Sequence, residues 1–139
     1  MPALATSASK NVPLRSPWLT VVAAWLVPGA GHFLLRRKGR AAIIFTSVIV
    51  AFLAGALMRG TMFQPTTAGD VLSRLIQLAG FIGDAASGLL YVIAISLGYW
   101  PPDQPTHNVD YGSKFLVTAG LLNILAMVDA YEIATRQKD

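Results

Sequence analysis

The sequence predicts an all-α integral membrane protein, a single helical bundle with three or four hydrophobic segments. Hydrophobic residues make up 54% of the 139 positions and charged residues only 13%, about half of the ~25% that is usual in soluble domains. The apolar residues gather in stretches close to the roughly 20 residues that cross a bilayer as a helix. Basic residues flank these stretches, and the chain is short enough for one domain only.

The first hydrophobic segment, residues 17–35, follows a polar leader that we expect to be disordered, residues 1–16. Pro28 removes a backbone hydrogen bond inside this segment, and Gly29 and Gly31 loosen the chain around it. A span kinked at Pro28-Gly29 and a re-entrant half-helix both fit this pattern. A cleavable signal peptide fits less well, because the charged region before the apolar run is diffuse.

Three further segments complete the predicted domain, residues 17–134. Residues 41–58 are uncharged and rich in β-branched and aromatic side chains, which is typical of a membrane-spanning helix. The next segment covers residues 70–99, where a pair of prolines ends it. The last covers residues 111–134 and precedes a polar tail, residues 135–139.

The densest cationic cluster of the sequence lies between the first two segments. It consists of Arg36, Arg37, Lys38 and Arg40. Basic residues on short loops favour the cytoplasmic side, so we expect this loop in the cytoplasm and the chain in the cell membrane as a multi-pass protein. The same residues are expected to anchor the topology and to contact anionic lipid headgroups. The distribution of Lys and Arg over the two sides favours a re-entrant first segment over four full spans.

Two stretches resemble known membrane protein families. Residues 25–33, WLVPGAGHF, with Arg36 and Gly39-Arg40 after them, resemble the start of the TM-two family, in which a short polar turn joins two membrane helices. Residues 121–134, LLNILAMVDAYEIA, are similar to the C-terminus of a family of small uncharacterised bacterial membrane proteins that open with the same Pro-Gly-Ala-Gly-His motif. These resemblances imply a location and an architecture, but no known activity.

The segment at residues 70–99 carries a stripe of polar and small side chains. Spacings of three and four residues relate Asp70, Ser73, Gln77, Gly80, Asp84, Ser87 and Tyr91. This regularity predicts one continuous helix with these residues on one face, and polar groups in a bilayer must face protein or water. Near the start of this helix, Asp70 and Arg74 are four residues apart and are expected to pair. Asn123, deep in the last segment, is expected to form an interhelical hydrogen bond.

Asp84 would lie well inside the membrane in this helix, where its carboxyl group needs a partner or a proton. It is interpreted as a hydrogen-bonded packing residue, as part of a proton or cation pathway, or as a group that reaches the surface where the helix tilts or breaks. Rows of small residues four apart, such as Gly80, Asp84 and Gly88, favour the packing interpretation because they let another helix approach closely.

His32 follows the Pro-Gly break and is expected to hydrogen-bond exposed backbone there, so it joins Pro28, Gly29 and Gly31 as a motif residue. A metal site of His32, His107 and Asp110 is conceivable, because all three would be cytoplasmic in this topology. No ligand spacing supports it, so we expect no metal or cofactor. Without cysteines, a nucleophile elbow, an HExxH sequence or a phosphate loop, an enzyme is not expected, and no basic face predicts nucleic acid binding.

The function best predicted is that of a packing, assembly or accessory subunit of unknown biochemical activity. The small-residue rows favour a homo-oligomer or a larger membrane complex, with membrane lipid as the other partner. The alternative is a small oligomeric channel or proton- or ion-conducting protein, in which Asp84 and Asn123 line a hydrated path. The surroundings of the stripe distinguish these hypotheses, since it would be dry in the first and wet in the second.

Overall fold

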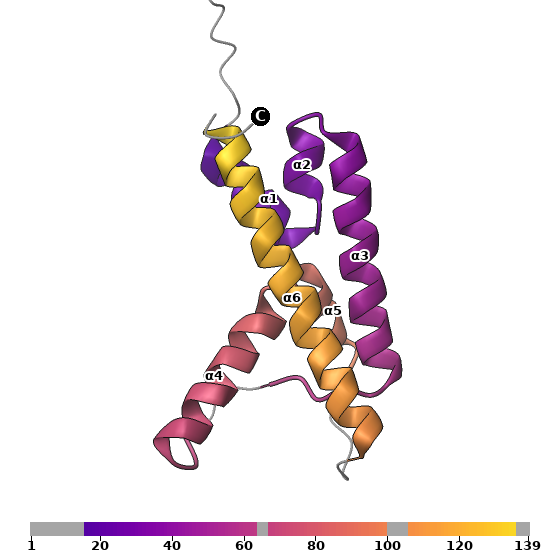
Figure 1. The fold of residues 1–139 in the computed structure, drawn as a ribbon, viewed down its shortest axis with the longest axis vertical. Helices are drawn as coiled ribbons and strands as arrows, with labels where there is room; N and C mark the ends of the chain where they lie inside the picture. The colour runs from indigo at the N-terminus through magenta and orange to yellow at the C-terminus, as the bar shows by residue number, and fades with distance from the viewer. Residues whose placement is uncertain (1–15, 64–66, 100–105, 136–139) are drawn as a thin grey trace, which may run out of the picture.

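The computed structural model describes residues 16–63, 67–99 and 106–135, which form α-helices and no β-strand (Figure 1). The prediction of an all-α membrane protein is confirmed. Within the described residues, α3 (Lys38–Leu57) and α6 (His107–Ala134) are each long and apolar enough to cross a membrane. They run antiparallel along the long axis of the molecule (Figure 1). With its 20 residues, α3 extends about 30 Å at ~1.5 Å per residue, the thickness of the hydrocarbon core.

Both long helices begin before the predicted segments. α3 starts at Lys38, within the cationic cluster, and α6 starts at His107, in a stretch that was predicted to be a loop. Asp110 lies in the first turn of α6, where a carboxylate is favoured by the positive end of the helix dipole. The extra turns lengthen the two helices at opposite ends of the molecule.

The first hydrophobic segment is a helical hairpin, which we call the first hairpin. Its arms are α1 (Pro17–Leu26) and α2 (Ala30–Leu34). Val27 is extended, with φ −126° and ψ 116°, as expected for a residue that precedes a proline. Gly29 then takes a left-handed φ of +81°, which a residue with a side chain rarely adopts. The chain therefore reverses at the predicted Pro28-Gly29 break.

Contacts with α6 show that the first hairpin returns to the end of the bundle at which it starts. The ring of Trp18, near the start of α1, lies 6.2 Å from the ring of Tyr131, close to the C-terminal end of α6. The tip of the hairpin receives a hydrogen bond from Asn123 in the middle of α6. His32 in α2 is again level with the end of α6, because it hydrogen-bonds Asp129. The hairpin thus begins with α1 and finishes with α2 at the same end of the bundle, which we call the cationic end.

The segment predicted as one helix over residues 70–99 is instead two helices, α4 (Val71–Ala85) and α5 (Leu89–Ser96), so that prediction is wrong. Their axes differ by 100° at a short break, residues 86–88. Gly88 has a φ of +63°, and a Cβ atom there would overlap the carbonyl oxygen of Trp25. The helix ends here because a glycine permits the turn and the tip of the first hairpin occupies the adjacent space.

α4 and α5 form a second hairpin that enters from the opposite end of the bundle (Figure 1). Its tip contacts Asn123 through the carbonyl oxygen of Ala86. Beyond α5, the hydroxyl of Tyr99 donates to the carbonyl oxygen of Gly60, just after α3, at 2.7 Å. Gly60 in turn contacts Gly112 near the start of α6. The second hairpin therefore returns to the end from which it entered and does not cross the bundle.

The order of a hairpin followed by a long helix occurs twice along the described chain. α1, α2 and α3 make the first unit, and α4, α5 and α6 make the second, which points the other way (Figure 1). The tips of the two hairpins meet at Asn123, about 24 Å along α6 from its start at ~1.5 Å per residue. The sequences of the two units show no detectable repeat that would accompany this inverted arrangement.

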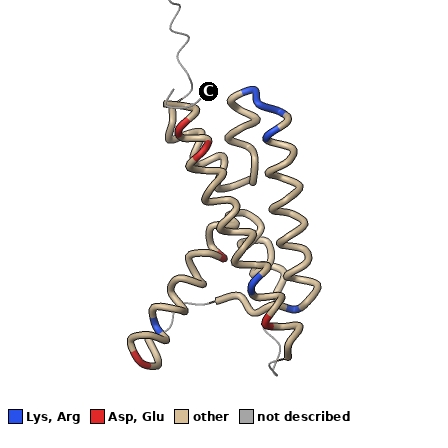
Figure 2. The backbone as a smooth tube through the Cα atoms, in the orientation of Figure 1, with Lys and Arg blue, Asp and Glu red and all other residues tan. Residues whose placement is uncertain are grey.

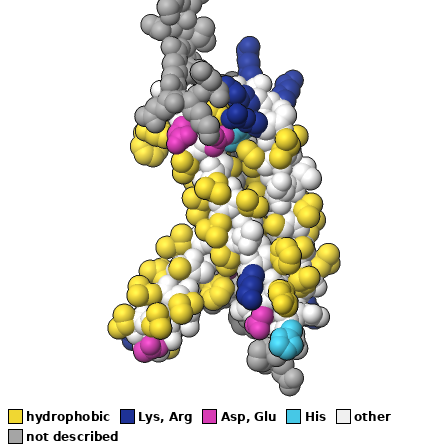
Figure 3. Space-filling view, viewed as in Figure 1, with side chains coloured by type: hydrophobic (Ala, Val, Ile, Leu, Met, Phe, Trp, Pro, Cys, Tyr) yellow, Lys and Arg dark blue, Asp and Glu magenta, His cyan; other side chains and the backbone are white. Residues whose placement is uncertain are grey.

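The buried core lies where α3, α5 and α6 meet. Its members are Val48, Phe52, Met62, Ala94, Leu116 and Ala119. Outside this core, the sides of the bundle are covered by hydrophobic side chains, and the charged ones collect near its ends (Figure 3). Such a surface suits a bilayer, whose hydrocarbon core covers the apolar sides while the charged ends reach the headgroups.

Candidate functional site

The centre of the molecule is a polar contact between the two hairpin tips, formed by Asn123 of α6. Its side-chain amide donates to the carbonyl oxygen of Ala86 at 2.8 Å and to that of Trp25 at 3.3 Å. Each of these carbonyls belongs to one hairpin, where a helix end leaves backbone oxygens without intrahelical donors. Asn123 is fully buried, so a single side chain satisfies both exposed ends in a dry environment.

Trp25 makes a second link between the hairpins. Its indole N–H donates to the carbonyl oxygen of Ala85 at the end of α4, at 3.1 Å. Glycines bring α4 equally close to α6, since a Cβ atom on Gly120 would overlap the carbonyl oxygen of Gly83. The hairpin tips and α6 therefore meet backbone to backbone, as small residues allow in membrane helix packing.

Asp84 lies two residues before the break and is 2% exposed. Its Oδ2 atom accepts a hydrogen bond from the backbone N–H of Phe63 at 2.7 Å. The Phe63 ring packs on Gly80, where a Cβ atom would collide with it. Asp84 thus fixes the connection between α3 and α4, and although the predicted helix does break, Asp84 does not reach the surface.

Several side-chain atoms at this centre have no hydrogen-bond partner among the described residues. They are Oδ1 of Asp84, Oγ of Ser87 and Oδ1 of Asn123. Ser87 is fully buried, like Asn123. Buried polar atoms are nearly always hydrogen-bonded. These three oxygens are therefore still able to accept a hydrogen bond or to bind a cation.

The other members of the predicted stripe do not join this centre. Ser73 hydrogen-bonds Asp70 at the start of α4, and Gln77 lies half-buried one turn further on. Tyr91 is on α5, beyond the bend, with its ring 6.2 Å from that of Phe81. The stripe is therefore divided by the break.

The predicted pair at the start of α4 does not form either. The Nε–H of Arg74 donates to the carbonyl oxygen of Gly69 at 3.1 Å, while Asp70 accepts from Ser73. This hydrogen bond from the Ser73 hydroxyl lowers the pKa of the exposed Asp70 carboxyl group. Asp70 precedes Val71 and so remains near the positive end of the helix dipole.

A second polar cluster lies at the cationic end and joins α2, α3 and α6. Nε2 of the buried His32 is 2.8 Å from Oδ2 of Asp129, and a guanidinium nitrogen of Arg40 is 3.5 Å from the same oxygen. Nδ1 of His32 has no hydrogen-bond partner among the described residues. The sequence did not predict this pairing of His32 with Asp129, because 97 residues separate them.

The conceivable metal site of His32, His107 and Asp110 is wrong. His107 begins α6 and His32 lies level with Asp129, so about 33 Å of helix at ~1.5 Å per residue separates them. The same geometry places the start of α6 at the end opposite the cationic cluster, not beside it as predicted. No group of three or more His, Cys, Asp or Glu side chains that could hold a metal ion occurs in the described part of the chain.

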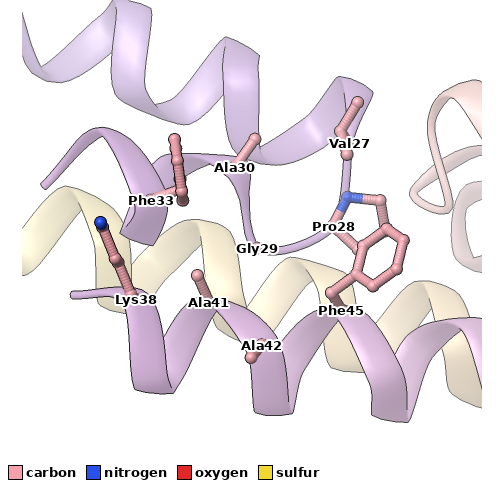
Figure 4. Close-up of a pocket in the computed structure, with 9 residues that line it drawn as sticks. All are labelled: Val27, Pro28, Gly29, Ala30, Phe33, Lys38, Ala41, Ala42 and Phe45. Atoms are coloured by element: carbon pink, nitrogen blue, oxygen red, sulfur yellow. The ribbon is translucent and has the colours of Figure 1, made fainter. Parts of the chain in front are cut away.

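A pocket of about 420 Å³ lies between the tip of the first hairpin and α3 (Figure 4). Its walls are almost wholly apolar, and Lys38 stands at one end while Phe45 and Pro28 lie at the other. Lys38 belongs to the cationic cluster, which lies around the connection from α2 to α3 (Figure 2). The pocket therefore has a charged mouth at the end of the bundle and an apolar interior further in.

Comparison with models of known protein families assigns the chain to a family. A family model described as a family of unknown function, DUF6677, matches residues 19–139. The chain belongs to the DUF6677 family. The match covers α1 from its third residue and all of the later helices, so nearly the whole inverted arrangement lies within the DUF6677 region. No curated protein and no solved structure matches the chain.

In this DUF6677 member, the N-terminal half of α4 diverges from the rest of the bundle (Figure 1). None of the residues 71–79 is buried. A groove of about 750 Å³ lies between this arm and α6. Its lining residues are Thr61, Phe63, Ile76, Gly80, Asp110, Ser113, Lys114, Val117 and Thr118. Sequence reasoning could not find this groove, because it depends on the bend at Gly88.

Proposed function

We propose that this chain is a non-catalytic integral membrane subunit that assembles with further copies of itself. The observation that carries the proposal is the diverging arm of α4, residues 71–79, in which no residue is buried. Leu72 and Leu75 on this arm are 64% and 58% exposed, which lipid tolerates. Ser73 and Gln77 lie on another face of the same arm, and a polar face in a bilayer favours a protein neighbour over hydrocarbon.

The groove beside the arm offers room for that neighbour. It holds apolar contacts from Ile76 and Val117 and hydroxyl groups from Ser113 and Thr118. Gly80 and the Phe63 ring packed on it also line the groove. A second copy of the chain brings an arm of the same composition, with Gln77 able to hydrogen-bond across the interface.

The buried centre favours an assembly role over catalysis. Asn123 and Trp25 use their polar groups to hold the hairpin tips together, and Asp84 holds the connection after α3. These side chains are packed away from solvent, whereas an active site needs reacting groups that substrate can reach. Conduction is the second candidate, favoured by the meeting of two re-entrant hairpins from opposite ends at Asp84 and Asn123.

Oxidative crosslinking of single cysteines tests the assembly proposal, because the chain has no native cysteine. Gln77→Cys should crosslink to a dimer in membranes. Leu75→Cys is the matched control, since residues two apart on a helix lie on nearly opposite faces, and it should remain monomeric. Single-molecule photobleaching in sparse liposomes gives the independent measurement. Single bleaching steps throughout would overturn the proposal, and cation flux abolished by Asp84→Asn would favour conduction instead.

We further propose that the cationic end faces the cytoplasm of a bacterial cell and contacts anionic lipid. Arg36, Arg37 and Lys38 form a dense group beside the Figure 4 pocket, whose apolar interior suits an acyl chain. Attraction to an anionic surface contributes about 1 kcal/mol per basic residue.

A further inference from the structure

The break in the second hairpin collects buried oxygen atoms that nothing in the described chain satisfies. Oδ1 of Asp84, Oγ of Ser87 and Oδ1 of Asn123 lack hydrogen-bond partners there, and none of these residues is more than 2% exposed. Leaving a polar atom buried and unpaired is costly. Three such atoms in one region of a small bundle therefore need an explanation.

The backbone brings these side chains together. Ser87 follows Asp84 by three residues, and its N–H donates to the Asp84 carbonyl oxygen at 3.0 Å. Between them in the chain, the Ala86 carbonyl oxygen accepts a hydrogen bond from the Asn123 amide at 2.8 Å. All three side chains thus border the same four residues, 84–87, at the end of α4.

The electrostatics of the break favour a positive charge. A buried carboxylate requires a counter-charge or a proton, and no Lys or Arg in the described part of the chain pairs with Asp84. The C-terminal end of α4 adds the negative end of a helix dipole at the same place. The phenols of Tyr91 and Tyr99 are within electrostatic range of Asp84, and neither supplies a positive charge.

We propose that Asp84, Ser87 and Asn123 form a binding site for a small monovalent cation of the Na⁺ class. A carboxylate, a hydroxyl and an amide oxygen are hard ligands, which suit hard cations. One carboxylate balances a single positive charge, so a monovalent ion leaves the centre neutral. Broken membrane helices use the same combination of side-chain oxygens and helix C-terminal ends to coordinate Na⁺. This site is independent of the assembly proposed above.

Binding of ²²Na⁺ to the purified full-length protein in nanodiscs tests the proposal, alongside melting temperatures in NaCl and in choline chloride at equal ionic strength. Wild type should bind ²²Na⁺ saturably, with a higher melting temperature in NaCl. Ser87→Ala is the most informative variant, because the Ser87 hydroxyl makes no hydrogen bond that the fold would lose. It should raise the half-saturating Na⁺ concentration about tenfold, the loss expected for one interaction with a charged group.

Ser96→Ala is the matched control, since Ser96 lies on the same hairpin but is exposed and bonds only the Val92 carbonyl oxygen in the described chain. It should bind ²²Na⁺ like wild type. Asp84→Asn should abolish saturable binding. Absence of saturable binding to the wild type would overturn the proposal, as would equal affinity in the Ser87→Ala variant. A melting temperature that follows pH and ignores Na⁺ would also overturn it, because Asp84 would then carry a proton.

Discussion

The side-chain amide of Asn123 lies 3.3 Å from the carbonyl oxygen of Trp25, 98 residues earlier in the chain. The same amide binds Ala86, so one residue of α6 holds the tips of both hairpins. Asn123→Ala leaves two buried carbonyl oxygens without this donor. We expect the free energy of unfolding to fall by about 2–4 kcal/mol, the cost of one to two unsatisfied buried groups.

Reversible unfolding in mixed micelles with increasing SDS measures this loss. Ser96→Ala on α5 is the control, because the Ser96 hydroxyl is exposed and bonds only the Val92 carbonyl oxygen among the described residues. It should change the unfolding free energy by less than about 0.5 kcal/mol. Similar values for the two variants would show that Asn123 does not hold the hairpins together.

Gly88 and Gly98 give a matched pair of tests for the contact between the hairpins. Both have a positive φ, +63° and +74°, so alanine at either position strains the backbone by about 1–2 kcal/mol. Only Gly88 also faces an obstacle, because its Cβ atom would overlap the Trp25 carbonyl oxygen, whereas a Cβ atom on Gly98 meets nothing within 4 Å. Gly88→Ala should therefore cost about 3 kcal/mol or more, and Gly98→Ala about 1 kcal/mol.

Thermal unfolding followed by tryptophan fluorescence compares the two glycine variants in one assay. With Trp18 and Trp100 replaced by Phe, the emission of Trp25, which lies at the contact with Gly88, also reports whether the hairpin tips have separated. A red-shifted emission is expected for Gly88→Ala before unfolding, and none for Gly98→Ala. Equal melting temperatures for both variants would mean that strain alone matters and that the tips do not meet.

The two chain reversals differ in how far the sequence could predict them. At Pro28-Gly29, proline lacks a donor and glycine permits a left-handed φ, so the local residues alone end the helix. Around Gly88, the polar and small residues keep helical spacing from Asp70 to Tyr91, and no local residue forces an end. There the break depends on contacts with Trp25 and Asn123, which are distant in the sequence. The spacing of residues along α4 and α5 cannot predict such tertiary contacts.

In the candidate site, too, the sequence could predict local features but not tertiary contacts. The depth of Asn123 in an apolar segment sufficed to predict a hydrogen-bonded side chain, but not which carbonyl oxygens it binds. The pairing of His32 with Asp129 was likewise outside the reach of sequence spacing, because it joins the first hairpin to the end of α6. Local chemistry predicts which residues need partners, and the arrangement of the helices decides which partners they find.

The His32–Asp129 contact should contribute far more to stability than the neighbouring ion pair. His32 is fully buried and its contact is 2.8 Å long, so His32→Leu, which removes this contact and leaves the Arg40 pair, should cost about 1–3 kcal/mol. Arg40 is 45% exposed and 3.5 Å from Asp129, so Arg40→Ala should cost less than about 1 kcal/mol. Unfolding in SDS compares them, and an equal or larger loss for Arg40→Ala would contradict this ranking.

The two re-entrant hairpins predict a definite pattern of accessibility in intact membranes. Single cysteines replace Ser16, Gly39, Thr67 and Thr106, and an impermeant maleimide is applied before and after permeabilisation. Ser16→Cys and Gly39→Cys should react from one side, because the first hairpin returns to its starting end. Thr67→Cys and Thr106→Cys should react from the other, because α5 returns towards the end of α3.

Each alternative topology gives a different labelling pattern, so the outcome is decisive whichever side proves to be cytoplasmic. A full span over the first segment would place Ser16 on the side of Thr67 and opposite Gly39. A full span over α4 and α5 together would place Thr106 on the side of Gly39, as the bent pair would allow if it crossed the bilayer. Only the inverted pair of hairpins separates Ser16 and Gly39 from Thr67 and Thr106, since α3 and α6 alone then cross the membrane.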